Sequence, residues 1–278
     1  MNNLLRELMP PIIYRALEKI KKENEFKSYP SYQVALESCT IDPYEQRELI
    51  EVIFKKTQRF ANKINSEVIP IWETTAYSLI SLINPVIENH SKEINVLDFG
   101  GACGAHYFQL RHLIDKNLKI NWVVVETPGM VAQAKQLETD ELSFYSNFDE
   151  AIEKLGTVDL LHTSGTLQCV DAPLMYLEKI LNCNAKWVSF NRLGLNQIDR
   201  DAVTIHASKL SWNGVGELPE GYTDKIVKYP FTFMSEKVFL EKVQNKYSLV
   251  AKSFDQSGMK AIKGEEIVGY GLLCKNIS

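Results

Sequence analysis

The residues that indicate a ligand-binding site most clearly, by their types and their spacing, lie at positions 96–104, which read V-L-D-F-G-G-A-C-G. An apolar run ends at Asp98, and Gly100, Gly101 and Gly104 follow it closely. Such a run is typical of a buried parallel strand, and glycines directly after a strand let the backbone turn tightly and approach a ligand. The helical pattern that follows offers unpaired N–H groups at its start. The segment therefore predicts a strand-turn-helix unit that binds a nucleotide or a nucleoside.

Asp98 narrows the class of ligand. A dinucleotide-binding loop has the spacing G-x-G-x-x-G and holds a pyrophosphate, which a carboxylate two residues before Gly100 would repel. A cationic ligand with an ammonium group suits this position better. The pattern D-F-G-G-A-C-G resembles the first motif of class I S-adenosylmethionine (SAM)-dependent methyltransferases, D-x-G-x-G-x-G, with Ala102 in place of the middle glycine. The resemblance implies that SAM is the cofactor and that Asp98, Gly100, Gly101, Ala102 and Gly104 bind it.

A second acid stands at the end of the next predicted strand. Glu126 follows Asp98 by one strand-helix-strand unit (126 − 98 = 28 residues). An acid in this register can accept hydrogen bonds from both ribose hydroxyls of a nucleoside; the alternative interpretation is a surface acid. We predict that Glu126 and Thr127 bind the ribose end of SAM.

The loops after the third and fourth strands complete the predicted cofactor site. The segment S-G-T-L-Q at 164–168 follows a D-L-L strand and resembles the fourth motif of the same methyltransferases. Ligands bind at the carboxyl ends of strands in open α/β sheets, so Ser164 and Gly165 are expected beside the methionine moiety. Ser146 and the aromatic residues around it either flank the adenine ring or belong to the core.

Candidate substrate residues follow the fifth strand. Asn191 and Arg192 stand at its predicted end, and an arginine can bind a carboxylate or a phosphate bidentately; the alternative is a salt bridge that holds the next loop. Trp212 and Tyr229 come later in the chain and could form an aromatic platform for a sugar or a small core of their own. These residues suggest an anionic acceptor.

Methyl transfer to a hydroxyl group usually needs a general base, whereas an amine needs only to be unprotonated. The candidate bases are His206, His106 and His162, in this order of preference, and each can instead be a structural histidine. The five cysteines are scattered without a C-x-x-C pair, so we expect reduced thiols, no disulfide framework and no metal site.

Strands and helices alternate from Ile94 onward, which predicts a parallel sheet covered by helices. The expected strands are 94–99, 121–126, 142–145, 158–163, 186–191, 247–253 and 267–274. The expected helices are 105–114, one that starts at 127–128, 147–155, 172–181 and 235–245. An insert at about 193–234 is expected to be irregular, with one strand at 202–206. The fold class is α/β: a doubly wound, Rossmann-like, seven-stranded sheet of order 3-2-1-4-5-7-6 with the last strand antiparallel, as the resemblance to class I methyltransferases implies.

Residues 1–92 read as a helical region on the substrate side of the SAM-binding domain at 93–278. We expect helices near the N-terminus, from Asp42 and Pro43 through Phe60, and at 72–87, with a loop at 28–32. The basic N-terminal helix either packs on the domain with its lysines solvated or lies on an anionic membrane surface.

The bulk composition excludes several classes of protein. A net charge of −4 argues against a nucleic-acid binder, because a phosphate backbone demands a basic footprint. No apolar run approaches the ~20 residues that a transmembrane helix needs. We therefore predict a cytoplasmic protein with a small-molecule or glycan acceptor; the sequence does not fix the oligomeric state, and a homodimer is compatible with it.

A looser resemblance covers nearly the whole chain. The segments Y-P-S-Y at 29–32, L-D-F-G-G at 97–101, S-G-T-L-Q at 164–168 and Y-P-F-T-F-M-S at 229–235 are similar to those of methyltransferases encoded with bacterial surface-polysaccharide genes. This resemblance implies O- or N-methylation of a sugar, a nucleotide sugar or a polysaccharide precursor. The alternative is a non-catalytic, methyltransferase-like partner in a biosynthetic complex, which Ala102 favours.

Overall fold

The computed structural model describes residues 27–39, 47–64, 73–88, 93–255 and 262–277. Its centre is a parallel sheet formed by the five apolar runs β1 (Glu93–Phe99), β2 (Lys119–Val125), β3 (Leu142–Tyr145), β4 (Leu160–Ser164) and β5 (Trp187–Asn196). The chain closes with β8 (Tyr247–Phe254) and β9 (Ile267–Asn276), and β9 pairs antiparallel to both β5 and β8. The order is therefore β3-β2-β1-β4-β5-β9-β8. With β8 and β9 counted as strands six and seven, this is the predicted order of the class I methyltransferase fold, which is confirmed. The described sheet has nine strands and not the predicted seven, because two strands of the insert also join it.

The parallel register brings the carboxyl ends of the strands to one edge of the sheet. Phe99 is the partner of both Val125 and Thr163, Val125 is the partner of Tyr145, and Ser164 is the partner of Asn191. The segments that leave β1, β2, β3 and β4 consequently start side by side. The sheet thereby gathers residues that lie far apart in the sequence.

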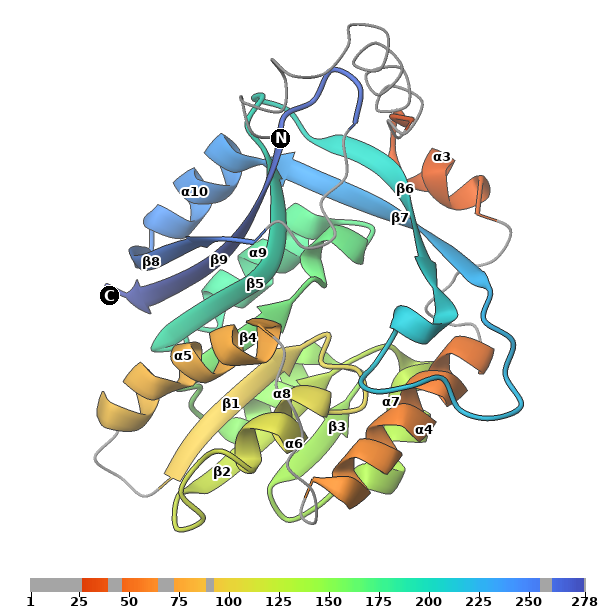
Figure 1. Cartoon of the computed structure of the whole chain (residues 1–278). Coiled ribbons are helices and arrows are strands. Elements are labelled where there is room, and N and C mark those ends of the chain that lie inside the picture. The colour runs from red at the N-terminus through yellow and green to blue at the C-terminus, as the bar shows by residue number, and fades with distance from the viewer. Residues whose placement is uncertain (1–26, 40–46, 65–72, 89–92, 256–261, 278) are drawn as a thin grey trace, which may run out of the picture.

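Each face of the sheet is covered by helices (Figure 1). One face packs against α4 (Arg47–Lys63), α5 (Glu73–Glu88), α6 (Ala105–Arg111) and α7 (Pro128–Ala134). The other packs against α8 (Phe148–Leu155), α9 (Pro173–Asn182) and α10 (Glu236–Gln244). Successive strand residues alternate between these layers.

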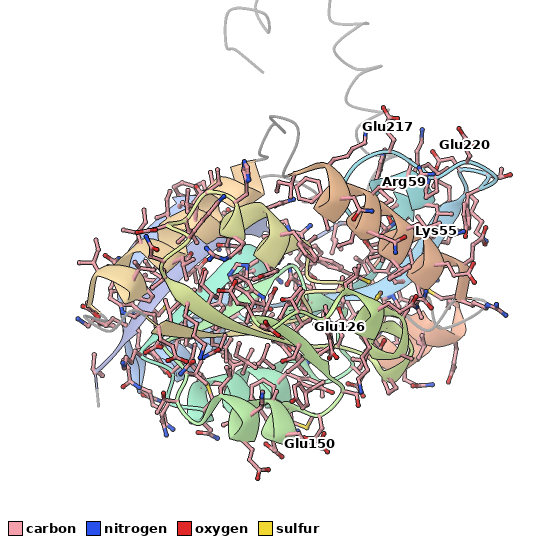
Figure 2. The ribbon with its side chains drawn as sticks, turned by 90° about the horizontal axis from the view of Figure 1, so that it is seen from below. Lys55, Arg59, Glu126, Glu150, Glu217 and Glu220 are labelled. Atoms are coloured by element: carbon pink, nitrogen blue, oxygen red, sulfur yellow. The ribbon has the colours of Figure 1, made fainter. Side chains whose placement is uncertain are left out.

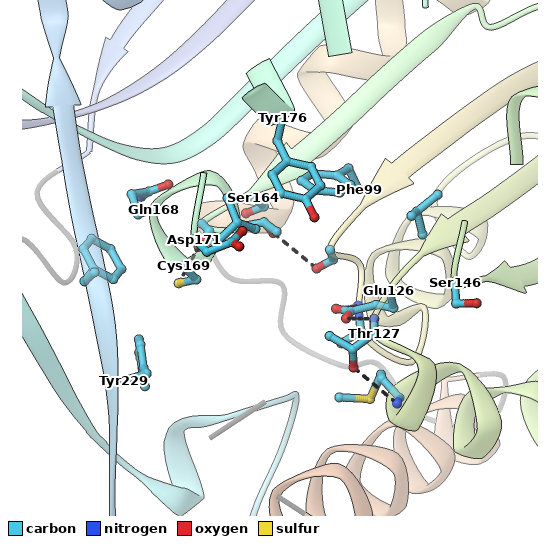
Figure 3. A pocket seen from close by; sticks show the side chains of 18 of the residues that line it. Phe99, Glu126, Thr127, Ser146, Ser164, Gln168, Cys169, Asp171, Tyr176 and Tyr229 are labelled. Carbon is cyan, nitrogen blue, oxygen red and sulfur yellow. Dashed lines mark hydrogen bonds between the residues drawn. The ribbon is translucent and has the colours of Figure 1, made fainter. Parts of the chain in front are cut away.

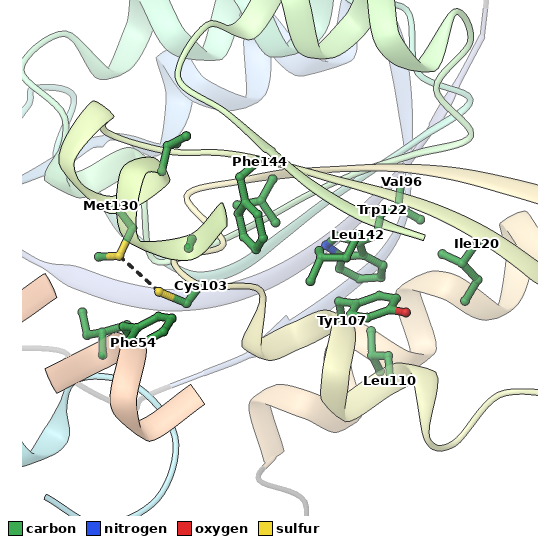
Figure 4. Close-up of a cluster of buried hydrophobic side chains, with 14 of the residues drawn as sticks. Phe54, Val96, Cys103, Tyr107, Leu110, Ile120, Trp122, Met130, Leu142 and Phe144 are labelled. Carbon is green, nitrogen blue, oxygen red and sulfur yellow. Dashed lines mark hydrogen bonds between the residues drawn. The ribbon is translucent and has the colours of Figure 1, made fainter. Parts of the chain in front are cut away.

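The first layer has a core in which Tyr107, Trp122 and Phe144 pack together (Figure 4). Phe54 of α4 belongs to the same cluster, and α4 packs against α6 and α7. Within the described residues, no helix combines the length and the apolar character needed to cross a bilayer.

The insert differs from its predicted structure. Two strands, β6 (Ala202–Lys209) and β7 (Ile226–Ser235), form an antiparallel hairpin, and β7 joins β5 through Leu195↔Met234 and Asn196↔Ser235. The expectation of a single strand in the insert was wrong, because residues 226–235 form a second one. Pro230 lies within this segment, and proline argues against a strand because it is disfavoured in strand interiors.

The predicted end of β5 at Asn191 was also wrong. The strand passes through an irregularity between Phe190 and Leu193 and continues to Asn196 against β9. The polar Asn191 and Arg192 therefore lie inside the strand and do not end it.

The described N-terminal residues pack against the hairpin. Tyr29 forms a bridge with Val203, and Thr204 Oγ1 donates to the carbonyl of Lys27 at 2.8 Å. A short helix, α3 (Tyr32–Glu37), begins where Ser31 Oγ accepts from the N–H of Val34. The expected loop at 28–32 thus runs into a helix that we had not predicted. The expected helices in residues 1–26, the membrane-surface alternative and the helix start at 42–43 lie outside the described residues.

Lys56 fastens α4 to the loop between β6 and β7. Its buried ammonium donates to the carbonyls of Ser211 at 2.8 Å and of Asn213 at 2.6 Å. Burial lowers the pKa of Lys56 to about 8, although Asp224 opposes the shift. The folded protein loses the Lys56 proton at a lower pH than the unfolded chain does. The free energy of unfolding therefore depends on pH.

We expect this linkage to be measurable by urea unfolding. Between pH 8 and the ordinary lysine pKa of 10.5, the unfolded state binds more protons at Lys56 than the folded state. The free energy of unfolding should therefore contain a component that rises with pH in this window, and Lys56→Met should lack it. Lys63→Met, an exposed change on the same helix, is the control. Identical pH profiles for the two variants would contradict the assignment.

Candidate functional site

A cavity of about 790 Å³ lies at the carboxyl edge of the sheet, bordered by the β6–β7 hairpin and by α3 and α4 (Figure 3). It collects most of the residues predicted for the site. The predicted residues that line it are Gly100, Ala102, Glu126, Thr127, Ser146, Ser164, Gly165, Arg192, His206, Trp212 and Tyr229. The predicted residues that do not line it are Asp98, Gly101, Gly104, His106, His162 and Asn191.

The glycine loop has a left-handed backbone at three positions. Gly100, Ala102 and Gly104 have φ values of 76°, 51° and 79°. At Gly100 a side chain is also excluded by space, because an added Cβ would lie 2.1 Å from Thr166 Oγ1. A left-handed alanine costs ~1–2 kcal/mol, yet Ala102 holds the conformation that a glycine would adopt. The loop therefore has a left-handed backbone at position 102 although the residue there is not a glycine.

Glu126 connects the glycine loop to the end of β2. Its Oε1 accepts from the N–H of Ala102 at 3.0 Å, and its Oε2 accepts from the N–H of Thr127 at 2.9 Å. Thr127 in turn caps α7 by accepting from the N–H of Met130. A carboxylate has about four lone-pair sites, so these two backbone bonds do not saturate it. The half-buried carboxylate both fixes the loop and faces the cavity (Figure 3).

Asp98 lies beneath the glycine loop and not in the cavity. Its Oδ2 accepts from Trp122 Nε1 at 3.2 Å and lies 3.3 Å from His106 Nδ1. The loop passes close above it, since a Cβ on Gly101 would lie 2.3 Å from that oxygen. Burial pushes the pKa of Asp98 upward, but His106, His162 and the Trp122 hydrogen bond outweigh burial and hold the pKa below its usual value.

The three candidate bases occupy different surroundings. His162 is buried with Nε2 3.2 Å from Ser78 Oγ, and burial lowers its pKa to about 4. His106 lies beside it, with ring centroids 5.0 Å apart. His206 lines the cavity on β6, 5.1 Å from the ring of Tyr229. We therefore keep His206 as the candidate base and no longer assign that role to His106 or His162, because neither faces the cavity.

The irregularity in β5 separates the two predicted substrate residues. Arg192 has a φ of 49° and projects into the cavity, where its Nε donates to Ser164 Oγ at 3.0 Å and its Nη2 to the Ser164 carbonyl at 2.8 Å. Asn191 is buried and its Nδ2 donates to Ser78 Oγ at 3.3 Å. Arg192 is thus held at the cavity wall, whereas Asn191 anchors α5 to the sheet.

Several cavity residues were not foreseen. Phe99 belongs to the core of the second layer and also lines the cavity, where it stacks on Tyr176 with ring centroids 5.4 Å apart. Tyr32 arrives from the N-terminal region and donates to the carbonyl of Cys169 at 2.7 Å. Asp149, in the first turn of α8, also lines the cavity. The segment Y-P-S-Y at 29–32 contributes only to the looser resemblance, and nothing in the sequence placed Tyr32 or Tyr176 at the site, because tertiary packing brings them there.

The sequence matches no protein-family model and none of the curated proteins. A solved SAM-dependent methyltransferase from Clostridium acetobutylicum is 15% identical, with 80% of this chain and 98% of that chain covered at a TM-score of 0.43. The 1,6-didemethyltoxoflavin-N1-methyltransferase of Burkholderia thailandensis is 11% identical, with 76% and 94% covered at a TM-score of 0.39. Because these TM-scores lie below 0.5, the fold assignment rests on the strand order and pairing.

Proposed function

We propose that this protein is a SAM-dependent methyltransferase. The observation that carries the proposal is the Glu126 carboxylate, which is tied to the Ala102 N–H and faces a cavity at the carboxyl edge of a class I methyltransferase sheet. An acid at the end of the second strand, beside a glycine loop, is arranged to accept hydrogen bonds from ribose hydroxyls. The left-handed loop and its position at this edge support a nucleoside ligand in the same place.

In the proposed complex each part of SAM has its own set of residues. Glu126 accepts from the ribose hydroxyls, and Ser146 and Asp149 offer polar atoms to the edge of the adenine ring. Gly100, Ala102 and the Ser164–Gly165 segment border the methionine moiety. The sulfonium of SAM supplies the driving force for methyl transfer, so the chain's contribution is alignment and exclusion of water.

Other residues of the cavity wall are proposed to bind the acceptor. They are Arg192, which adjoins the Ser164–Gly165 segment, and His206, Trp212 and Tyr229. A guanidinium has five N–H donors, and the two bonds of Arg192 to Ser164 hold it in place for an acidic group. We expect an anionic acceptor of glycan type, such as a sugar, a nucleotide sugar or a surface-polysaccharide precursor, with His206 accepting a proton when the nucleophile is a hydroxyl.

Isothermal titration calorimetry with SAM and with S-adenosylhomocysteine tests the proposal, with NAD as the comparison ligand. We expect saturable binding of both sulfur nucleosides and none of NAD. Absence of heat with both at tens of micromolar folded protein would refute SAM dependence. Co-purification with a glycosyltransferase in that case would support the non-catalytic alternative.

A further inference from the structure

A second group of ionisable side chains lies outside the cavity, below the glycine loop. Asp98 on β1 and His162 on β4 are register partners in adjacent strands, and His106 stands in the first turn of α6 above them. Each offers one potential ligand atom, and these atoms all lie within 4.8 Å of one another. The scattered cysteines led us to expect no metal site, and Asp98 and His162, which are 64 residues apart (162 − 98), form no ligand motif.

Two atoms of this cluster lack hydrogen bonds. Asp98 Oδ1 and His162 Nδ1 are buried, and neither has a hydrogen-bond partner among the described residues. The residues themselves are 0% and 1% exposed. Buried polar atoms are normally paired with protein or with ordered water, and a buried unpaired carboxylate oxygen is costly. A bound cation would satisfy both atoms at once.

We propose that Asp98, His106 and His162 bind a divalent transition-metal ion, with Zn²⁺ as the best chemical match. Two imidazoles and one carboxylate suit Zn²⁺ and disfavour Mg²⁺ and Ca²⁺, which prefer sets of oxygen ligands. In tetrahedral zinc with bonds of ~2.0–2.1 Å, ligand atoms lie ~3.3 Å apart. His106 Nδ1 and Asp98 Oδ2 are already at 3.3 Å. An ion held by both oxygens of the Asp98 carboxylate would satisfy the unpaired Oδ1 as well, and it requires that His162 Nδ1 approach this pair.

The surroundings resemble the outer shell of a metal site. Ser78 Oγ lies 3.2 Å from His162 Nε2, which leaves Nδ1 as the nitrogen without a partner. Trp122 Nε1 donates to Asp98 Oδ2 at 3.2 Å and orients the carboxylate. Such outer-shell hydrogen bonds fix the orientation of ligands in metal sites.

The position of the cluster assigns the ion a structural role. None of the three ligands lines the cavity, so the ion would not touch SAM or the acceptor. It would join β1, β4 and α6 directly below Gly101, whose missing side chain lets the loop pass over Asp98. The inference is independent of the proposed methyltransferase activity, because metal content is measured without SAM.

The test is the metal content of the untagged protein, measured by inductively coupled plasma mass spectrometry after dialysis against a small excess of Zn²⁺ and then against metal-free buffer. We expect about one Zn²⁺ per chain, and a lower melting temperature after chelation that Zn²⁺ but not Mg²⁺ restores. His106→Ala and Asp98→Asn should each lower the retained Zn²⁺ about tenfold or more. His112→Ala, an exposed histidine just after α6, is the matched control and should retain it.

Circular dichroism shows whether each variant is folded, and His106, which is partly exposed, is the variant least prone to misfold. Cobalt substitution adds a second readout, since a Co²⁺ ion with these ligands gives visible absorption bands that His106→Ala should abolish. Wild-type protein without retained metal, or folded variants that retain as much Zn²⁺ as His112→Ala, would overturn the proposal.

Discussion

Replacing Glu126 by glutamine is expected to weaken SAM binding about 100-fold, or ~2.8 kcal/mol. The carboxylate accepts from the N–H groups of Ala102 and Thr127, and hydrogen bonds to a charged acceptor contribute ~1.5–3 kcal/mol each. A glutamine would turn its NH₂ group toward one of these donors and would also lose an acceptor for the proposed ribose hydroxyls. Titration calorimetry with SAM and S-adenosylhomocysteine measures the change in affinity.

Glu150→Gln is the matched control for this experiment. Glu150 is exposed on α8 and lies at the edge of the molecule, whereas Glu126 lies within it (Figure 2). Both substitutions remove one negative charge, so a general electrostatic effect would weaken binding in both. We expect the affinity of Glu150→Gln to equal that of the wild type. An unchanged affinity in Glu126→Gln would contradict the assignment of the ribose site.

Gly100→Ala is expected to abolish measurable SAM binding and to lower the free energy of unfolding by ~2–4 kcal/mol. Gly100 has a φ of 76°, which costs a non-glycine residue ~1–2 kcal/mol. The new Cβ would also lie 2.1 Å from Thr166 Oγ1 and 2.3 Å from Thr166 Cγ2, so the loop and the segment after β4 must separate. Urea unfolding and calorimetry measure the two effects.

Two further variants separate the effect of backbone strain from the effect of the steric clash with Thr166. Gly156 has a φ of 69° and nothing within 4 Å of an added Cβ, so Gly156→Ala should lose stability through backbone strain and keep its SAM affinity. Removing the side chain that collides, in the double variant Gly100→Ala/Thr166→Gly, should recover part of the binding. Equal SAM affinity in Gly100→Ala and Gly156→Ala would show that the contact between Gly100 and Thr166 is unimportant.

The sequence by itself determined most of the elements, although it missed α3 and β7, and the resemblance to class I methyltransferases implied the strand order. Apolar runs separated by helical patterns predicted β1 to β5 within a few residues, and the closing pair predicted β8 and β9. The carboxyl ends of parallel strands share one edge, so the placement of Gly100, Glu126 and Ser164 around one cavity also followed from the sequence. These features depend on local residue patterns, which a single sequence contains.

The tertiary structure alone decided which way the side chains point. Strands in a doubly covered sheet are apolar on both faces, so no periodicity revealed that Asp98 faces Trp122 and the histidines under the loop. The irregularity at Arg192, which sends it into the cavity and its neighbour Asn191 into the core, depends on pairing with β9. Tyr32 reaches Cys169 across 137 residues. The direction of a side chain, the irregularities in strand register and the long-range contacts all arise from packing between distant segments. Local residue patterns do not encode this packing.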